Sequence, residues 1–311
     1  MNRAGVISRK FFNLLPQNMR RAVYWNRVFS PAVKGPFRPH PHRIIIDITT
    51  ACDISCMDCN RSCGMDQAPA REHMTPDQIR RFIDESISSG RLWCGLAGEV
   101  EPEQNGIRIQ GGDPQYEGLR IEGGEPTLNP ALHEILDLLA GYKNYCGSRT
   151  DFVLCTNGHS PEGRKQLENV PSGITVYNSA KQTRGIDHHC AFNAAPNDSV
   201  FFKGHDFSNG CWLPMYYGIG LTQHGFYPHP ICGGIDRVMG FDIGLKSLPP
   251  PDYSWREHYR ILCRYCGHYN RYCPEGAVRY APISLERGRM SSSWRKAYTS
   301  YRRNKPVLSR Y

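Results

Sequence analysis

Three cysteines in the first quarter of the chain lie at a spacing that suits an inorganic cluster. Cys52, Cys56 and Cys59 form the pattern C-x3-C-x2-C, directly after a short apolar run that predicts a buried strand. Three thiolates at this spacing can bind a 4Fe–4S cluster and leave one iron open for another ligand. A structural zinc site would more often show paired C-x2-C knuckles with closed tetrahedral ligation. Cys63 follows in the same loop, and we expect it to take no part in ligation.

A second group of cysteines follows in the last third of the chain. Cys211 and Cys232 are separated by 20 residues, and Cys263 and Cys266 form a C-x2-C knuckle. Four thiols of this kind can close a second metal site, either an auxiliary iron–sulfur cluster or a structural zinc knuckle. Cys273 is an alternative to one of the four.

The cysteine content and the start of the chain predict a reducing compartment. The total of 13 cysteines is odd, which fits a disulfide framework poorly. The first residues carry positive charge but neither a long apolar segment nor a small-residue cleavage site, and no long apolar run suits a membrane span. We therefore expect a cytoplasmic protein in which clustered thiols bind metal or do chemistry.

Charge is distributed unevenly along the chain. The net charge is +9: residues 1–43 contribute +9, residues 279–311 contribute +8, and the segment between them carries about −8. The acidic middle, without a zinc-finger, helix-turn-helix or RNA-binding signature, argues against nucleic acid as a partner. The basic ends predict attraction to an anionic substrate or peripheral association with an anionic membrane.

Strands and helices alternate through the first 180 residues. Apolar β-branched runs predict strands, and Thr75, Pro76 and Gln78 mark a capped helix start. In chain order we expect a strand at 43–50, a helix at 75–90, a strand at 119–124, a helix at 129–142, and strands at 151–158 and 173–180. Residues 90–117 are expected to form an inserted hairpin. This alternation predicts an α/β fold with parallel strands, open or closed into a barrel.

Two of the expected strands end in motifs that accompany such cysteines in a known family. Gly-Gly-Glu-Pro occupies 123–126, and Thr-Asn-Gly occupies 156–158. Together with the C-x3-C-x2-C loop, these motifs resemble the radical S-adenosylmethionine (SAM) enzymes over roughly residues 43–185. The resemblance implies a partial (β/α)6 barrel and a 4Fe–4S cluster on the three cysteines of that loop, with SAM bound at the open iron.

The resemblance also implies a SAM pocket at the ends of these strands. Its expected residues are Gly123, Gly124, Glu125, Pro126, Asn157, Gly158 and Ser179. The glycines would bring the backbone close to the ligand, and Glu125 or nearby carbonyls would accept hydrogen bonds from the methionyl ammonium. The family usually has an aromatic residue before the third cysteine, whereas this chain has Asp58. Adenine packing must therefore differ here.

After residue 185 the pattern changes to segments rich in histidine, glycine, proline and cysteine. They resemble the twitch, or truncated SPASM, extension of some radical SAM enzymes. That resemblance implies a small cysteine-rich α+β domain with an auxiliary 4Fe–4S cluster on the second group of cysteines. The expected organisation is a basic amphipathic extension at 1–42, a radical SAM barrel at 43–185, the auxiliary domain at 186–278 and a basic tail at 279–311.

For function, the resemblance implies an enzyme that cleaves SAM reductively to a 5′-deoxyadenosyl radical. The radical would remove hydrogen from a small polar metabolite, such as a sugar, an aminocyclitol or a nucleotide-linked sugar. The implied partners are that substrate, which the basic ends suggest is anionic, and an electron donor such as flavodoxin or ferredoxin. Cys190, next to His188 and His189, is a candidate hydrogen donor to a substrate radical.

Two other functions stay open at this point. The alternative enzyme is a maturase that epimerises or crosslinks a ribosomal peptide, although residues 1–43 are too short and too basic for a leader-peptide-binding domain. A non-enzymatic iron–sulfur or zinc protein is less favoured, because a pure electron carrier needs no SAM pocket.

Overall fold

The computed structural model describes residues 37–54, 56, 59–63, 72–93, 103–104, 107–108, 118–147, 151–180, 192–202, 204–211, 213–271 and 290–311. The predictions for the N-terminal extension up to residue 36, and for Asp58, Cys190 and Cys273, lie outside these residues.

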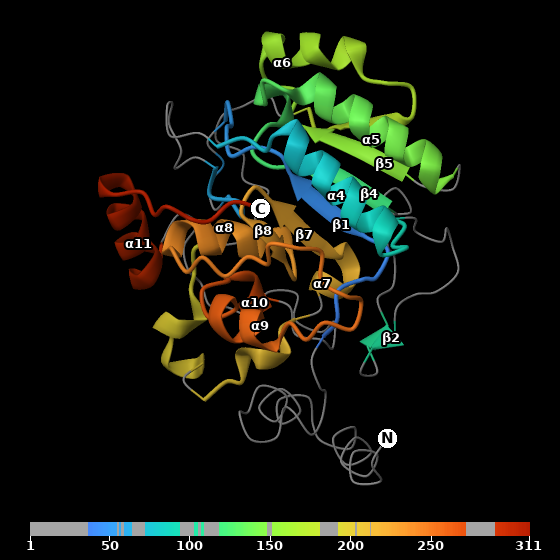
Figure 1. The fold of residues 1–311 in the computed structure, drawn as a ribbon. Helices are drawn as coiled ribbons and strands as arrows, with labels where there is room; N and C mark the ends of the chain where they lie inside the picture. The colour runs from blue at the N-terminus through green and yellow to red at the C-terminus, as the bar shows by residue number, and fades with distance from the viewer. Residues whose placement is uncertain are drawn as a thin grey trace, which may run out of the picture.

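A six-stranded sheet organises the described residues (Figure 1). Its strands are β1 (Ile44–Asp47), β4 (Gly118–Glu122), β5 (Asp151–Thr156), β6 (Ile174–Asn178), β7 (Ile219–Thr222) and β8 (Gly225–Tyr227). They follow the order β6-β5-β4-β1-β7-β8, and all neighbours are parallel except the hairpin β7–β8. The predicted α/β class with parallel strands is confirmed. The chain order reverses at β1, which has β4 on one side and β7 on the other.

Helices connect and cover these strands. They are α4 (Pro76–Ser88), α5 (Leu132–Cys146), α6 (Pro161–Gln166), α7 (Leu213–Tyr217), α8 (Pro230–Met239), α9 (Arg256–Leu262), α10 (His268–Arg271) and α11 (Ser292–Arg303). The predicted start of α4 is confirmed. The Thr75 hydroxyl accepts from the Gln78 backbone N–H, and the Gln78 side chain accepts from the Thr75 N–H.

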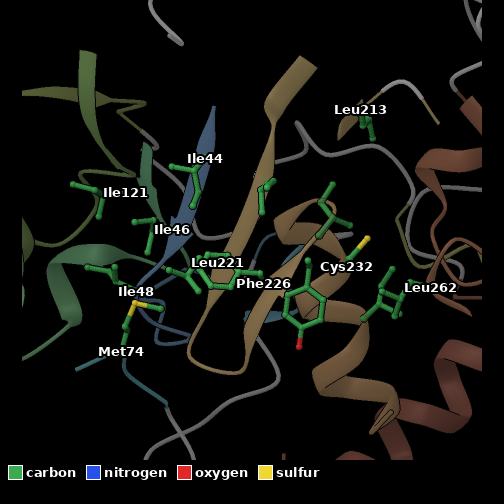
Figure 2. Close-up of a cluster of buried hydrophobic side chains, with 14 of the residues drawn as sticks. Ile44, Ile46, Ile48, Met74, Ile121, Leu213, Leu221, Phe226, Cys232 and Leu262 are labelled. Carbon is green, nitrogen blue, oxygen red and sulfur yellow. The ribbon is translucent and has the colours of Figure 1, made fainter. Parts of the chain in front are cut away.

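One face of the sheet belongs to the hydrophobic core. Ile44 and Ile46 of β1 are register partners of Leu119 and Ile121 of β4, and all four side chains are fully buried. They share one hydrophobic cluster with apolar residues of α4 and α5, and Figure 2 shows Ile44, Ile46 and Ile121 side by side. Helices α4 and α5 therefore cover this face (Figure 1).

The other face carries polar side chains, because successive residues of a strand point to opposite sides. Arg120 and Glu122 of β4 are register partners of Ile45 and Asp47 of β1. The two strands thus read I-I-I-D and L-R-I-E, with charges only at alternate positions. This polar face is where we find the candidate site.

The hairpin β7–β8 extends the main sheet, although we expected this segment in a separate auxiliary domain. Ile219 and Leu221 of β7 are register partners of Ile44 and Ile46 of β1. Between them, Gly220 lets α8 approach, since a Cβ there would lie 2.2 Å from the backbone nitrogen at the start of that helix. The sheet therefore joins the regions that hold the two groups of cysteines.

Residues 290–311 are folded on the protein, although we expected them in a basic tail. The buried side chains of α11 are Trp294, Tyr298 and Tyr301, which share one face of the helix. The helix packs on α8 at the outside of the molecule (Figure 1). At the chain end, the carbonyl of Tyr311 accepts a hydrogen bond of 3.0 Å from the Gln78 side chain. The burial of these three aromatic side chains thus holds residues 290–311 on the protein, despite the positive charge from which we expected a tail.

The described part of the insertion forms the expected hairpin. Strand β2 (Glu103–Gln104) pairs in antiparallel fashion with β3 (Ile107–Arg108). Within the described ranges, no helix combines the length and the apolar character that a bilayer crossing requires.

Candidate functional site

The polar face of the sheet opens into a cavity of about 420 Å³. Its lining comes from the loop after β1, from the ends of β4, β5 and β6, and from α7, α10 and the start of α8. The residues in this lining that were expected from the sequence are Cys52, Cys56, Cys59, Gly123, Gly124, Asn157 and Ser179. Open α/β sheets bind ligands at the carboxyl ends of strands where the chain order reverses, as it does here at β1.

Gly123 and Gly124 bring the end of β4 against the cysteine loop. A Cβ on Gly124 would lie 2.1 Å from the carbonyl oxygen of Ala51 and 3.2 Å from the Cβ of Cys52. A Cβ on Gly123, whose φ is +136°, would lie 2.4 Å from the carbonyl oxygen of Thr49. We expected these glycines to admit a ligand, and the structure shows that they allow two protein segments to touch.

Glu125 is a buried link between two strands. Its side chain is 1% exposed and is not part of the cavity lining. The carboxylate accepts hydrogen bonds from the hydroxyls of Thr127 and Thr156 and from the backbone N–H of Asn157, at 2.8, 2.7 and 2.7 Å. Burial raises the pKa of Glu125, and these hydrogen bonds oppose the rise. The Glu125 side chain therefore does not face the cavity in which we expected a methionyl ammonium. Pro126 is buried in the following turn.

Asn157 connects the end of β5 to the cysteine loop. Its side-chain N–H donates to Oδ1 of Asp53 at 2.7 Å, and the other Asp53 oxygen is buried without a partner among the described residues. Gly158 has a φ of +62°, and a Cβ there would lie 2.3 Å from the Asn178 side chain. Ser179 lines the cavity, and its hydroxyl donates to a carbonyl of β5 at 3.0 Å.

The three thiols of the first loop share this cavity. Cys52, Cys56 and Cys59 are half-buried and form no disulfide. Burial raises the pKa of Cys52 to about 12, and the Cys59 thiol adds to the rise. Such a thiol stays protonated until a metal ion replaces the proton. Three thiols from one short loop at one cavity are a donor set that fits an iron–sulfur cluster. Cys63 is buried in the same lining, and a hydrogen bond with Cys59, followed by burial, raises its pKa.

A charged group that the sequence analysis missed lies beside this loop. Arg61 is 9% exposed, and its guanidinium contacts Asp47 at 2.9 Å and Glu122 at 2.8 Å. Arg120 contacts the same Glu122 at 3.0 Å and the Cys155 sulfur at 3.1 Å. Burial raises the pKa of Asp47 to about 6, although the Arg61 charge opposes the rise. The sequence carried a signal for Asp47, Arg120 and Glu122, because they are charged residues at alternate positions of apolar strands. Arg61 lies in the loop, where no such pattern indicates its role.

The second group of cysteines lies in the buried core. The thiols of Cys211, Cys232, Cys263 and Cys266 are buried and free of disulfides. Burial raises the pKa of Cys232, and the neighbouring thiols of Cys266 and Cys211 raise it further. The pKa of Tyr259 is raised by burial and then by three of these thiols, Cys263 among them. Figure 2 shows Cys232 within the buried cluster.

Neither group of cysteines converges on a single point within the described part of the chain. Within the described ranges, no three His, Cys or carboxylate side chains converge in the way that one ion requires. Zinc gathers its ligands at one point, at about 2.0–2.3 Å. A 4Fe–4S cluster binds each thiolate at a different iron atom, so its ligands are spread apart. Four buried thiols are a donor set for either of the two expected groups, an auxiliary 4Fe–4S cluster or a structural zinc ion.

Two histidines of the lining, His229 and His268, were not predicted. His229 caps α8, since its Nδ1 accepts from the Ile231 backbone N–H at 3.2 Å. Burial holds the pKa of His229 well below its ordinary value, so the neutral ring carries its proton on Nε2. That Nε2 is buried and has no partner among the described residues. The Nε2–H group of His229 is therefore an available hydrogen-bond donor, and His229 lies three residues before Cys232 in the chain.

Comparisons with known proteins assign this chain to no family. No protein-family model matches it, and no curated protein matches its sequence.

Proposed function

We propose that this protein is a radical SAM enzyme. The observation that carries the proposal is the shared cavity: the C-x3-C-x2-C loop, Gly123 and Gly124, Asn157 and Ser179 come from four segments of the chain and line one space. The sequence motifs alone had indicated these residues as parts of one site. On this proposal, β1, β4, β5 and β6 belong to a partial (β/α)6 barrel whose inner face is the polar face of the sheet.

The residues present fit the two cofactors. Cys52, Cys56 and Cys59 would hold a 4Fe–4S cluster, and the strand ends at Gly124 and Asn157 would hold SAM. When bound, the reduced cluster and SAM supply a one-electron cleavage that yields a 5′-deoxyadenosyl radical. The chain itself contributes the cavity, a loop held by Arg61 and strand ends joined by Glu125.

The rest of the lining favours a small hydroxylated metabolite as substrate. The charges of Arg61 and Arg120 are balanced by those of Asp47 and Glu122, so this wall carries no excess charge for an anion. Tyr177, Tyr217 and His229 add hydroxyl groups and one N–H donor to the lining. The buried thiols of the second group would hold an auxiliary 4Fe–4S cluster, which could accept an electron from the substrate radical or bind the substrate.

Anaerobic reconstitution tests this proposal. We expect iron and sulfide at about eight atoms each per chain, as two 4Fe–4S clusters require. With SAM and dithionite the protein should form 5′-deoxyadenosine, measured by liquid chromatography and mass spectrometry. Cys56→Ser should abolish that product, and Cys232→Ser should lower the iron content by about four atoms. The control is Cys146→Ser at the end of α5, which should change neither. If the wild type binds iron but forms no 5′-deoxyadenosine, the proposal is wrong.

A further inference from the structure

Helix α11 has two faces of different chemistry. Its inner face carries the three buried aromatic side chains described above. Its outer face, here called the basic face, carries the exposed side chains of Arg295, Lys296, Arg302 and Arg303. No described residue forms an ion pair with any of these four. Residues 290–311 contain six Lys/Arg and no Asp/Glu, so the field of this surface is positive.

The inner face of α11 contacts the first cysteine loop. The hydroxyl of Tyr298 lies 2.9 Å from the hydroxyl of Ser62, and both are buried. The backbone N–H of Ser62 donates to the carbonyl of Cys59 at 2.9 Å. Two hydrogen bonds therefore connect the helix to one of the three proposed cluster ligands.

The same helix contacts the second group of cysteines. The indole N–H of Trp294 donates to the carbonyl of Tyr265 at 2.8 Å. Tyr265 lies within the C-x2-C knuckle formed by Cys263 and Cys266. The inner face of one helix thus contacts Ser62 in the first cysteine loop and Tyr265 in the C-x2-C knuckle, and its outer face presents a positive surface.

We propose that the basic face is the docking surface of an acidic one-electron carrier protein of the flavodoxin or ferredoxin kind. The inference rests on the proposed function, because a cluster that reduces SAM needs a source of single electrons. The carrier loses one electron and a cluster of this protein gains it, and no covalent bond forms or breaks. Opposite charges on the two proteins would speed their encounter and orient the carrier over the helix that contacts both groups.

The composition of the surface favours a protein partner over a membrane. Helices that lie in a membrane interface expose Trp, Phe or Leu to the acyl chains. In α11 the aromatic residues are buried in the protein core, and every exposed side chain of the helix is polar or charged. The one large apolar side chain exposed within 290–311 is Val307, and single apolar residues are ordinary on protein surfaces.

The test compares two double variants of the full, anaerobically reconstituted chain. Arg295→Glu with Lys296→Glu reverses charge on the basic face, in the first half of α11. Lys143→Glu with Lys165→Glu makes the same change in net charge on α5 and α6, at the far end of the molecule (Figure 1). Binding of oxidised flavodoxin is measured by isothermal titration calorimetry at low and at physiological ionic strength, and thermal unfolding checks that both variants are folded.

We expect the α11 variant to bind flavodoxin at least about tenfold more weakly than the wild type, with a smaller dependence on salt, and the control to bind within about twofold. The ratio of flavodoxin-driven to dithionite-driven 5′-deoxyadenosine formation should fall in the α11 variant only. Equal binding by both variants would overturn the docking surface. So would a loss of binding to phosphatidylserine vesicles in the α11 variant with flavodoxin binding intact, since that result assigns the surface to a membrane. If the wild type forms no 5′-deoxyadenosine with dithionite, the proposed function fails, and the calorimetry still decides the docking surface.

Discussion

The carboxylate of Glu125 accepts a hydrogen bond of 2.7 Å from the backbone N–H of Asn157, which joins the ends of β4 and β5 beside the cavity. The Asn157 side chain in turn donates to Asp53 in the cysteine loop. Two motifs that are separate in the sequence, Gly-Gly-Glu-Pro and Thr-Asn-Gly, are therefore parts of one hydrogen-bonded unit. A change of the Glu125 side chain should therefore reach the cysteine loop through Asn157, although the Glu125 backbone N–H also donates directly to the Ala51 carbonyl at 2.7 Å.

Glu125→Gln should destabilise the fold. The carboxylate accepts hydrogen bonds at both oxygens, and the NH2 group of the new amide would replace one of them. At least one N–H or O–H donor would then lose its acceptor, and an unsatisfied buried donor costs about 1–3 kcal/mol. Urea unfolding of the purified protein measures the loss, and equilibrium dialysis measures SAM affinity in the reconstituted protein. If the variant unfolds like the wild type but no longer binds SAM, then Glu125 contacts the ligand directly and the linking role is wrong.

Gly124→Ala should displace the cysteine loop. The added Cβ would meet the Ala51 carbonyl at 2.1 Å, and backbone on both sides leaves little room to relax. We expect a loss of about 3 kcal/mol or more in the free energy of unfolding, at the upper end for single substitutions, and a lower iron content after reconstitution. Gly141→Ala in α5 is the matched control, because a Cβ there meets nothing within 4 Å. That change should stabilise the helix by about 1 kcal/mol. Similar effects of the two substitutions would contradict the close approach at Gly124.

Arg61→Met should cost about 3–5 kcal/mol, since removing one member of a buried ion pair leaves charge without compensation. The carboxylates of Asp47 and Glu122 would both lose their contact with the guanidinium. Adding Asp47→Asn should recover part of the loss, because Arg120 still contacts Glu122. Denaturant unfolding of the two variants and of Asp47→Asn alone gives the coupling between the sites. A cost below about 1 kcal/mol for Arg61→Met would mean that the pairs behave as solvent-exposed ones.

Local sequence signals predicted most of the parallel core. The capping box at Thr75 and Gln78 located α4, and apolar runs located β1, β4, β5 and β6 close to their observed bounds. These signals depend on neighbours in the chain. The pairing of β7 with β1 depends on contacts between residues about 175 positions apart, such as Ile44 with Ile219, and no local pattern contains it.

The candidate site was predicted as a set of motifs but not as a network. Cys52, Cys56, Cys59, Asn157 and Ser179 line one cavity, whereas the Glu125 carboxylate points away from it into the protein. Motif resemblance indicates which residues gather but not where each side chain points. Helix α11 was missed because its charges dominate the composition, although Trp294, Tyr298 and Tyr301 recur at helical spacing.

The last prediction concerns Glu72, which connects the segment before α4 with two distant parts of the chain. Its carboxylate lies 3.3 Å from Nε2 of His224 and 3.4 Å from Nζ of Lys305. Burial raises the pKa of Glu72, but His224, Lys305 and Arg237 lower it more strongly, to about 2 from an ordinary value of 4.5. Because the folded state holds the carboxylate charged, the unfolded state binds the proton more readily. Glu72 therefore stabilises the fold above about pH 4.5, and this stabilisation is lost as the pH falls toward 2.

Glu72→Gln should remove this part of the pH dependence. Between pH 5 and pH 3 the wild type should lose more stability than the variant, by an amount on the order of 1–2 kcal/mol, since the protonation of Glu72 costs the folded state more than the unfolded state. Unfolding by urea at the two pH values measures both proteins, and Asp84→Asn on the exposed side of α4 serves as a control for the loss of one carboxylate. Equal losses in the wild type and in Glu72→Gln would show that the contacts with His224 and Lys305 do not hold the carboxylate in its charged form.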